Sequence, residues 1–241
     1  MRIVTWNLKN GKGAAVWPRL HFSLGADVIL LQESPKPDWH GGVAWDKVPD
    51  GHWGSAVLAA TGTIRKLTVE GYEGWVVGGE LLGSGLNAAE RPLYVFSIHA
   101  PTGNAARPRR QYVEEVVRIL NGIGRLVPSD ADLVLGGDFN FLSLGDRKES
   151  ESIRTTPAER EGLIRFGQMG LVSCWTAAHP GRALAQTLRW SGDKTPDKAT
   201  PYHCDGIFVP ASWNSGTICE ILTATCFEVS DHYPVAAWIV R

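Results

Sequence analysis

The stretch Leu133–Asn140 reads LVLGGDFN and joins a short apolar run to a polar end. The run Leu133–Leu135 is typical of a strand that is buried on both faces. Two glycines follow it, and Asp138 and Asn140 then place polar groups directly beyond the strand. Polar side chains at strand ends gather at one edge of a sheet, where proteins commonly bind their ligands.

Other polar side chains occupy matching positions elsewhere in the sequence. Asn7, Glu33 and His99 each follow an apolar run. Three more precede an apolar run instead, namely Asp205, Asp231 and His232. If the last two strands run antiparallel to the earlier ones, all eight side chains meet at one edge of the sheets. That edge then carries four carboxylates, two carboxamides and two imidazoles.

A cluster of this composition predicts metal-assisted chemistry on phosphate. Hard oxygen ligands suit Mg²⁺ or Mn²⁺, and carboxylates this close repel one another unless a cation neutralises them. An imidazole beside an Asp is held protonated and then binds a phosphate oxygen. Taken singly, Asn7 also fits a turn, Glu33 a solvated charge and His99 a core histidine. The ordered set favours a functional site over these separate roles.

Further apolar runs predict strands over 3–6, 28–31, 55–59, 93–98, 206–209 and 234–240. Helices are expected over 109–126, over about 17–24, and from a capping box at Thr156-Pro157-Ala158-Glu159 to about Met169. Segments 35–53, 140–155 and 189–204 have the composition of surface loops. Strands and helices alternate early, but hairpin-like stretches such as 55–77 intervene. We therefore expect mixed sheets packed face to face, with helices outside them.

The bulk composition is that of a globular protein. Hydrophobic residues make up 44% and charged residues 20% of the chain, and 24 basic residues balance 25 acidic ones to a net charge of -1. Such a balance gives no global basic field, so phosphate binding must be local. The length suits one domain over 1–241.

The cysteines and the apolar runs predict a location. The four cysteines form no C-x-x-C pair and are interpreted as buried reduced thiols. The N-terminus has no signal-peptide pattern, and no apolar run approaches the about 20 residues that span a bilayer. We expect a soluble cytoplasmic protein, and no protein partner is indicated.

Seven motifs in order resemble the endonuclease/exonuclease/phosphatase superfamily, which has the DNase I-like fold. They extend from one end of the chain to the other: Ile3–Asn7, Leu30–Glu33, Trp53–Leu58, Ser97–Pro101, Gly136–Asn140, Asp205–Val209 and Ser230–Val235. The resemblance implies an α/β protein with a four-layer α/β/β/α sandwich. It also implies Mg²⁺-dependent hydrolysis of phosphoesters.

The resemblance also implies roles at the metal and at the attacking water. Glu33 corresponds to the principal metal-binding carboxylate, with Asn7 and Asp231 close to the metal. Asp138 corresponds to the residue that activates or positions water, and Asn140 to one that orients water and phosphate.

The two histidines receive roles at the phosphate from the same resemblance. His232 corresponds to the histidine that contacts the scissile phosphate, with Asp205 as its carboxylate partner. His99 matches a second histidine of the DNase I-like and sphingomyelinase-like branches. The abasic-site enzymes of the family have a different residue there, so this match argues against a role in abasic-site repair. The chain departs from the family at His203 and Cys204, where a basic and an aliphatic residue are usual. It also has no clear match for a further Arg or Tyr, which puts leaving-group assistance in doubt.

The substrate is less clearly indicated than the chemistry. Arg107 and Arg109 follow the His99 loop and are plausible phosphate contacts, as is His203. Solvated charges and a strand position are the plainer interpretations of these residues. Three tryptophans cluster over 39–53, where they could stack on bases or pack in a core.

Three functions are therefore carried forward. The first is a nuclease-type phosphodiesterase acting on DNA or RNA. The second is a phosphatase or phosphodiesterase acting on small or lipid phosphoesters, which the near-zero net charge favours. The third is a non-catalytic binding module with the same fold.

Overall fold

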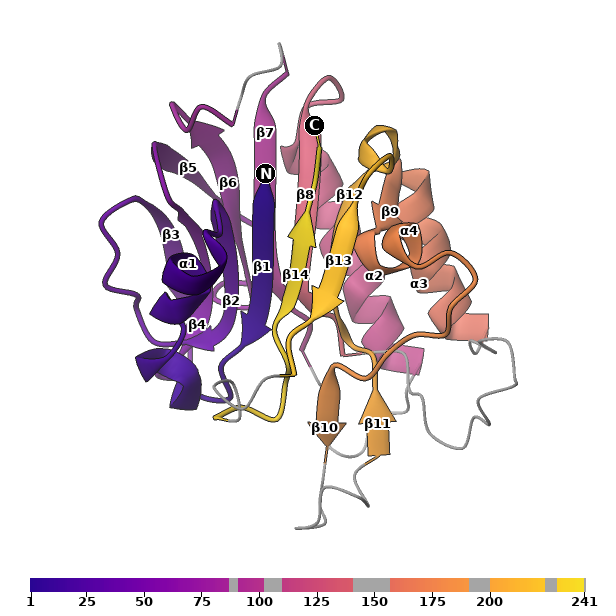
Figure 1. The fold of residues 1–241 in the computed structure, drawn as a ribbon, viewed down its shortest axis with the longest axis horizontal. Coiled ribbons are helices and arrows are strands. Elements are labelled where there is room, and N and C mark those ends of the chain that lie inside the picture. The colour runs from indigo at the N-terminus through magenta and orange to yellow at the C-terminus, as the bar shows by residue number, and fades with distance from the viewer. Residues whose placement is uncertain (87–90, 102–109, 141–156, 191–199, 224–228, 241) are drawn as a thin grey trace.

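The computed structural model describes residues 1–86, 91–101, 110–140, 157–190, 200–223 and 229–240. Two six-stranded sheets pack face to face, and helices cover their outer faces (Figure 1). Both sheets contain parallel and antiparallel neighbours, so both are mixed. The predicted fold class, an α/β sandwich of four layers, is confirmed.

The first sheet contains strands from both ends of the chain. Its order is β13 (Ile218–Ile221), β14 (Val235–Trp238), β1 (Arg2–Asn7), β2 (Val28–Ser34), β4 (Gly54–Ala59) and β3 (Gly42–Lys47). The second sheet has the order β5 (Thr63–Thr68), β6 (Val76–Leu82), β7 (Leu93–His99), β8 (Asp132–Asp138), β12 (Asp205–Pro210) and β9 (Leu171–Ser173). A separate hairpin joins β10 (Leu188–Trp190) to β11 (Thr200–Tyr202).

The helices are α1 (Pro18–Leu24), α2 (Arg110–Leu126), α3 (Pro157–Gln168) and α4 (Cys174–Ala178), with short 3-10 turns at Lys12–Ala15 and Ala211–Trp213. The predicted helices over 17–24, 109–126 and 156–169 are confirmed to within one or two residues. Thr156 of the predicted capping box lies outside the described residues. No helix in the described part of the chain is both long and apolar enough to cross a membrane.

Three apolar layers hold the sandwich together, and alternation along the strands creates them. On β1, Ile3 faces the layer between the two sheets, whereas Val4 faces the layer beneath α1. On β8, Val134 faces the central layer, and Leu133 faces the layer beneath α2 and α3. Strands buried on both faces read as continuous apolar runs, which is why the sequence revealed them.

Two predicted surface loops contain strands. The loop predicted over 35–53 is wrong at β3, an edge strand that pairs antiparallel with β4. Glycine, tryptophan and charged residues interrupt its alternation, so its composition resembles that of a loop. The loop predicted over 189–204 is wrong at its two ends, where β10 and β11 pair with each other. Residues 191–199 lie outside the described part.

The hairpin-like stretch 55–77 is divided between the two sheets. Its first strand, β4, pairs with β2 and β3 in the first sheet. The chain then crosses over, and β5 and β6 form an antiparallel hairpin at the edge of the second sheet. The crossing encloses the central apolar layer from one side.

We expect Gly78→Ala to destabilise the protein strongly. A Cβ atom at Gly78 would lie 2.1 Å from the Phe96 ring, and Phe96 is fully buried. Overpacking of this kind costs about 1–3 kcal/mol. The free energy of unfolding in urea measures the loss.

The matched control is Gly167→Ala in α3, where no atom lies within 4 Å of an added Cβ. Alanine should stabilise this helix position by up to about 1 kcal/mol. Equal stabilities of the two variants would contradict the packing of β6 against β7.

Candidate active site

The sheet topology brings the polar strand ends to one edge. β1 is parallel to β2 and β7 is parallel to β8. The ends of the two pairs meet on the same side, because Asn7 contacts Asp138 and His99 lies 3.7 Å from Glu33. β14 runs antiparallel to β1, and β12 runs antiparallel to β8. The side chain that begins β12 and those that precede β14 therefore reach the edge at which the earlier strands end, as predicted.

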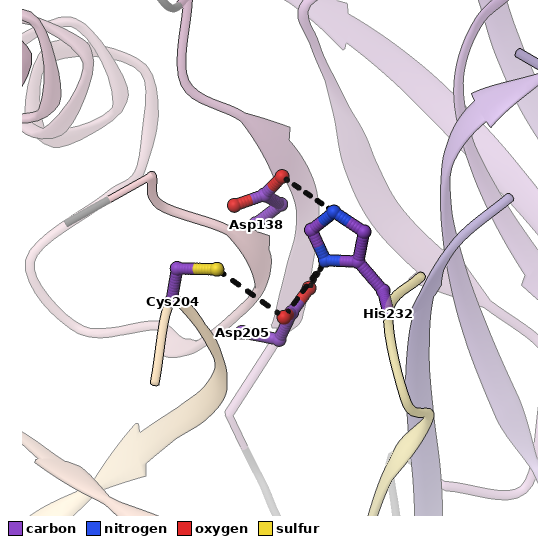
Figure 2. A group of neighbouring side chains, drawn as sticks. All are labelled: Asp138, Cys204, Asp205 and His232. Carbon is purple, nitrogen blue, oxygen red and sulfur yellow. Dashed lines mark hydrogen bonds and ion pairs between the residues drawn. The ribbon is translucent and has the colours of Figure 1, made fainter. Parts of the chain in front are cut away.

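A carboxylate–imidazole–carboxylate chain lies at the centre of this edge (Figure 2). The Nδ1 atom of His232 lies 3.0 and 2.9 Å from the two carboxylate oxygens of Asp205. Its Nε2 atom faces Asp138 Oδ2 at 3.7 Å. Asp138 and Asp205 are register partners on β8 and β12, and all three residues are buried. The backbone pairing thus sets the spacing of the two carboxylates, and the imidazole lies between them.

The carboxylates determine the charge of His232. Burial by itself lowers the pKa of the imidazole, but Asp205 and Asp138 outweigh it and raise the pKa to about 10. Burial raises the pKa of Asp138, and the charge of His232 opposes that shift. An imidazolium is therefore held beside Asp205, with its Nε2–H directed to the side that Asp138 occupies.

Asn7 joins this chain to Glu33. Its Nδ2 group donates to Glu33 Oε1 at 3.1 Å and to Asp138 Oδ2 at 3.0 Å. Glu33 has a φ of 50°, and the pairing of β2 with β4 shifts register between Leu31 and Ser34. This irregularity turns the Glu33 carboxylate toward the edge, where the amide of Asn10 donates to Oε2 at 2.6 Å.

His99 lies against an aromatic wall. Its ring centroid is 5.2 Å from that of Trp53 and 5.1 Å from that of Trp75. Its Nε2 atom is 3.7 Å from Glu33 Oε1 and 3.8 Å from Asp138 Oδ2. Burial lowers the pKa of His99, and the neighbouring carboxylates offset only part of that shift. Nδ1 is buried without a hydrogen-bond partner.

Asn140 and Asp231 complete the predicted set. Asn140 has a φ of 54°, its amide donates to Asp138 Oδ1 at 2.9 Å, and its side chain donates to the Ala100 carbonyl at 2.8 Å. Asp231 forms an ion pair with Lys9 at 2.8 Å. The structure therefore brings all eight predicted side chains to one edge, with Asp231 at its rim.

Gly137 allows β7 and β8 to approach each other at this edge. A Cβ atom there would lie 1.8 Å from the Ile98 carbonyl oxygen. The close approach places His99 opposite Asp138 in the parallel register. The glycine before the Asp is thus required by backbone packing.

Sequence reasoning missed two residues that hold the site in place. Lys9 donates its amide to Asn7 Oδ1 at 2.9 Å and pairs with Asp231. Ser230 donates to the Asn7 carbonyl at 2.8 Å and accepts from the His232 amide at 3.1 Å. Ser230 belongs to a quoted motif, whereas no local pattern singles out Lys9.

Of the three predicted phosphate contacts, the structure describes only His203. His203 is buried, and its Nδ1 donates to the Ala185 carbonyl at 2.5 Å. Burial lowers the pKa of His203 to about 4, so the ring is neutral at neutral pH. Arg107 and Arg109 lie outside the described residues.

The clustered tryptophans divide between core and site. Trp39 packs against Trp17 with tilted rings and donates to the Ala59 carbonyl, and Trp45 donates to the Ser34 carbonyl. Trp53 is half-buried against His99. Two of the three thus serve packing.

Two sets of donors at this edge can hold a cation. One consists of the oxygens of Glu33 and Asn7, which contact each other, and of Asp231, which Lys9 links to Asn7; such hard ligands fit Mg²⁺ or Mn²⁺. The other consists of Asp138, Cys204, Asp205 and His232, whose ligand atoms lie within 4.8 Å of one another (Figure 2). The imidazolium form of His232 has no free lone pair, and burial raises the pKa of the Cys204 thiol well above its usual range. The oxygen set is therefore the better site for a hard cation.

Solved structures share this architecture along their whole length. An AP endonuclease from Archaeoglobus fulgidus matches with a TM-score of 0.75 at 15% identity, with 100% of each chain covered. NExo from Neisseria, described as a 3′ phosphatase bound to a product DNA hairpin, matches at 0.71 and 17%, again over 100% of each chain. The chain has the DNase I-like fold.

The same fold recurs in NExo from Neisseria meningitidis, described as a 3′-5′ exonuclease, with a TM-score of 0.69, 18% identity and 100% of each chain covered. A comparison with models of protein families finds no match. A search of curated protein sequences also finds none. The DNase I-like fold predicted from seven short motifs is thus supported by three-dimensional similarity at low sequence identity.

His203 should make the protein acid-sensitive. The unfolded state takes up a proton below a pKa of about 6.5, but folded His203 does so only below about 4. Its stabilising contribution is therefore complete above pH 6.5 and is lost as the pH falls toward 4, by up to about 3 kcal/mol.

Asparagine at this position keeps a donor for the Ala185 carbonyl but does not titrate. Urea unfolding of wild type and His203→Asn at pH 7 and pH 4.5 measures the difference. The stability gap between the two proteins should shift in favour of His203→Asn at the lower pH. An unchanged gap would mean that His203 is not buried as described.

Proposed function

We propose that this protein is a divalent-metal-dependent phosphoester hydrolase, most specifically a nuclease-type phosphodiesterase. The observation that carries the proposal is the buried Asp205–His232–Asp138 chain, which Asn7 links to Glu33. Proteins of the same fold are described as an AP endonuclease and as a 3′ phosphatase and exonuclease. Their descriptions and this site point to the same class of reaction.

Each site residue has a separate role in the hydrolysis, which follows from its position. The Nε2–H of the His232 imidazolium binds an oxygen of the scissile phosphate, and Asp205 holds the ring by Nδ1. Asp138 accepts a proton from the attacking water, and Asn140 keeps its carboxylate oriented through the 2.9 Å amide contact. The water oxygen bonds to phosphorus as the bond to the leaving oxygen breaks. His99, whose pKa is lowered by burial, places its Nε2 atom beside Glu33 and Asp138 and can contact the substrate there.

Mg²⁺ is the proposed cofactor, and Mn²⁺ is a substitute. Glu33, Asn7 and Asp231 would hold it, since their oxygens suit a hard cation. When bound, the ion supplies positive charge for the phosphate oxygens as negative charge develops there. The Lys9 ammonium, which pairs with Asp231 at 2.8 Å, adds positive charge at the rim of this site.

A phosphatase or phosphodiesterase acting on small or lipid phosphoesters is the alternative. The net charge of -1 favours it, and one neighbour of the same fold is described as a 3′ phosphatase. The presence of His99 argues against an abasic-site repair enzyme, and this stays a prediction. Similarity to an AP endonuclease at 15% identity shows the fold alone. A non-catalytic binding module is the least supported function, since the whole ionisable set is in place.

A cytoplasmic location, like a single domain over 1–241, stays a prediction. In the described part of the chain three cysteines are free and buried, namely Cys174, Cys204 and Cys219. Reduced, buried thiols are typical of a reducing compartment.

Asp138→Ala and His232→Ala should each lower kcat/KM at least about a hundredfold, because each removes proton transfer or charge stabilisation at the phosphate. The assay is cleavage of plasmid, single-stranded DNA and RNA with Mg²⁺ or Mn²⁺, alongside inositol phosphates and sugar phosphates. Exposed Asp130→Ala is the control and should retain wild-type turnover.

Phosphate release from the small esters, with every polymer untouched, would select the alternative function. Near-wild-type turnover of either site variant would falsify the assigned roles. A wild-type protein that hydrolyses neither bis(p-nitrophenyl) phosphate nor p-nitrophenyl phosphate with any divalent ion would favour the binding module.

Glu33→Gln should raise the Mg²⁺ concentration needed for half-maximal activity. The substitution keeps the size of the side chain but removes the charge that attracts the cation. A titration of activity against Mg²⁺ measures the change, and kcat at saturating metal should fall less than the affinity. An unchanged titration curve would remove Glu33 from the metal site.

A further inference from the structure

The short strand β10 is fastened to the loop that carries Asp231 and His232. The Arg189 amide donates to the Asp231 carbonyl at 2.9 Å, and the Tyr233 amide donates to the Thr187 carbonyl at 2.7 Å. Leu188 and His232 form an antiparallel bridge between these two contacts. In Figure 1 the β10–β11 hairpin projects beyond the edge at which β1 ends. Arg189 is therefore held at a fixed place beside the active-site loop.

The side chain of Arg189 is placed by an aromatic ring. Successive residues of a strand point to opposite faces, so Arg189 points away from the face that Leu188 shares with His232. Its guanidinium carbon lies 4.8 Å from the centre of the Tyr233 ring. This stacking holds the planar group on the side of the loop where Asp231 and Tyr233 lie.

Among the described residues, the Arg189 guanidinium has few partners. Its Nε atom is buried with no hydrogen-bond partner, and NH2 makes a single long contact of 3.5 Å to the Ser230 carbonyl. No carboxylate in the described ranges forms an ion pair with it. In contrast, Arg65 pairs with Glu80 and Arg118 with Glu115. Leaving the donors of a half-buried guanidinium without acceptors costs free energy, so an acceptor from a ligand would bind favourably here.

The neighbouring charges favour an anion at this place. The Asp231 carboxylate on the same loop already forms an ion pair with the Lys9 ammonium at 2.8 Å. Lys9 is partly exposed, with 39% of its side chain accessible. Two cationic residues, Lys9 and Arg189, thus contact the Asp231–Tyr233 segment at the rim of a site whose centre contains several carboxylates. Because the chain as a whole is nearly neutral, such a local pair is the means of attracting a polyanion.

We propose that Arg189 binds a phosphate group that neighbours the scissile phosphate, and that the substrate is a polynucleotide. The inference rests on the proposed nuclease function and narrows its substrate class. A guanidinium presents a planar fork of donors that matches phosphate oxygens, and stacking on Tyr233 holds that fork ready. A small phosphomonoester has no second phosphate to occupy this position.

Binding without cleavage tests the proposal directly. Asp138→Asn supplies a protein that should not cleave, and fluorescence anisotropy with a labelled single-stranded oligodeoxynucleotide measures its Kd over a range of salt concentrations. Adding Arg189→Gln should raise Kd at least about tenfold and reduce the slope of log Kd against log salt by about 0.7, the value for one phosphate contact on a single strand. Arg189→Lys should recover the slope but only part of the affinity. Arg182→Gln, at an exposed arginine of the same segment, is the matched control and should leave both unchanged.

Turnover in the otherwise wild-type protein separates phosphate binding from a structural role. Arg189→Gln should lower kcat/KM for the oligonucleotide at least about tenfold more than for bis(p-nitrophenyl) phosphate, which has no flanking phosphate. Equal losses on both substrates would show that Arg189 only fastens β10, and would overturn the proposal. Unchanged Kd and salt slope would overturn it as well.

The same measurements separate failure of the inference from failure of the proposed function. If the wild type cuts bis(p-nitrophenyl) phosphate but no polymer, the nuclease function is wrong, and the Asp138→Asn binding data still decide whether Arg189 contacts phosphate. If that protein also binds no oligonucleotide, the inference is overturned too. If polymers are cut and Arg189→Gln has no effect on binding, the nuclease function stands and only the phosphate contact of Arg189 is overturned.

Discussion

The placement of two buried carboxylates side by side is the constraint on which this site depends. Asp138 and Asp205 are register partners on neighbouring strands, and both are almost fully removed from solvent. Uncompensated charges in such a place would cost several kcal/mol each, about the whole stability of a domain. His232 reaches the space between them from the loop before β14 and supplies the compensating charge. The fold must therefore bring the segments that carry Asp138, Asp205 and His232 together. It does so because β12 runs antiparallel to β8 and β14 runs antiparallel to β1.

Strain in the backbone surrounds this unit. Lys9, Asn10, Glu33 and Asn140 all have φ values near +50° although none is a glycine. Each such residue costs about 1–3 kcal/mol, and it persists only where the surrounding packing determines it. Here three apolar layers on both faces of the two sheets provide that packing. Stability from the interior of the sandwich thus offsets strain at the edge where ligands bind.

Asn7 couples the two halves of the edge. Its amide group contacts Glu33 on the side of the proposed metal and Asp138 on the side of the imidazolium. Its backbone carbonyl accepts from Ser230, which also holds the His232 amide. One carboxamide thus contacts a carboxylate on each side of the edge. The aromatic wall around His99 and the hairpin that carries Arg189 then border this unit.

The sequence by itself predicted which polar side chains meet at one edge of the sheets and which strands form the core. Strands buried on both faces leave continuous apolar runs, and polar residues at their ends stand out against them. Local periodicity is weak in short edge strands such as β3 and β13, so the sequence alone did not reveal these. Only the tertiary structure decided the partners: Lys9 meets Asp231 and Arg189 meets Tyr233 because the strand order folds remote segments together. Contacts of this kind depend on topology, and neither spacing nor composition along the chain encodes topology locally.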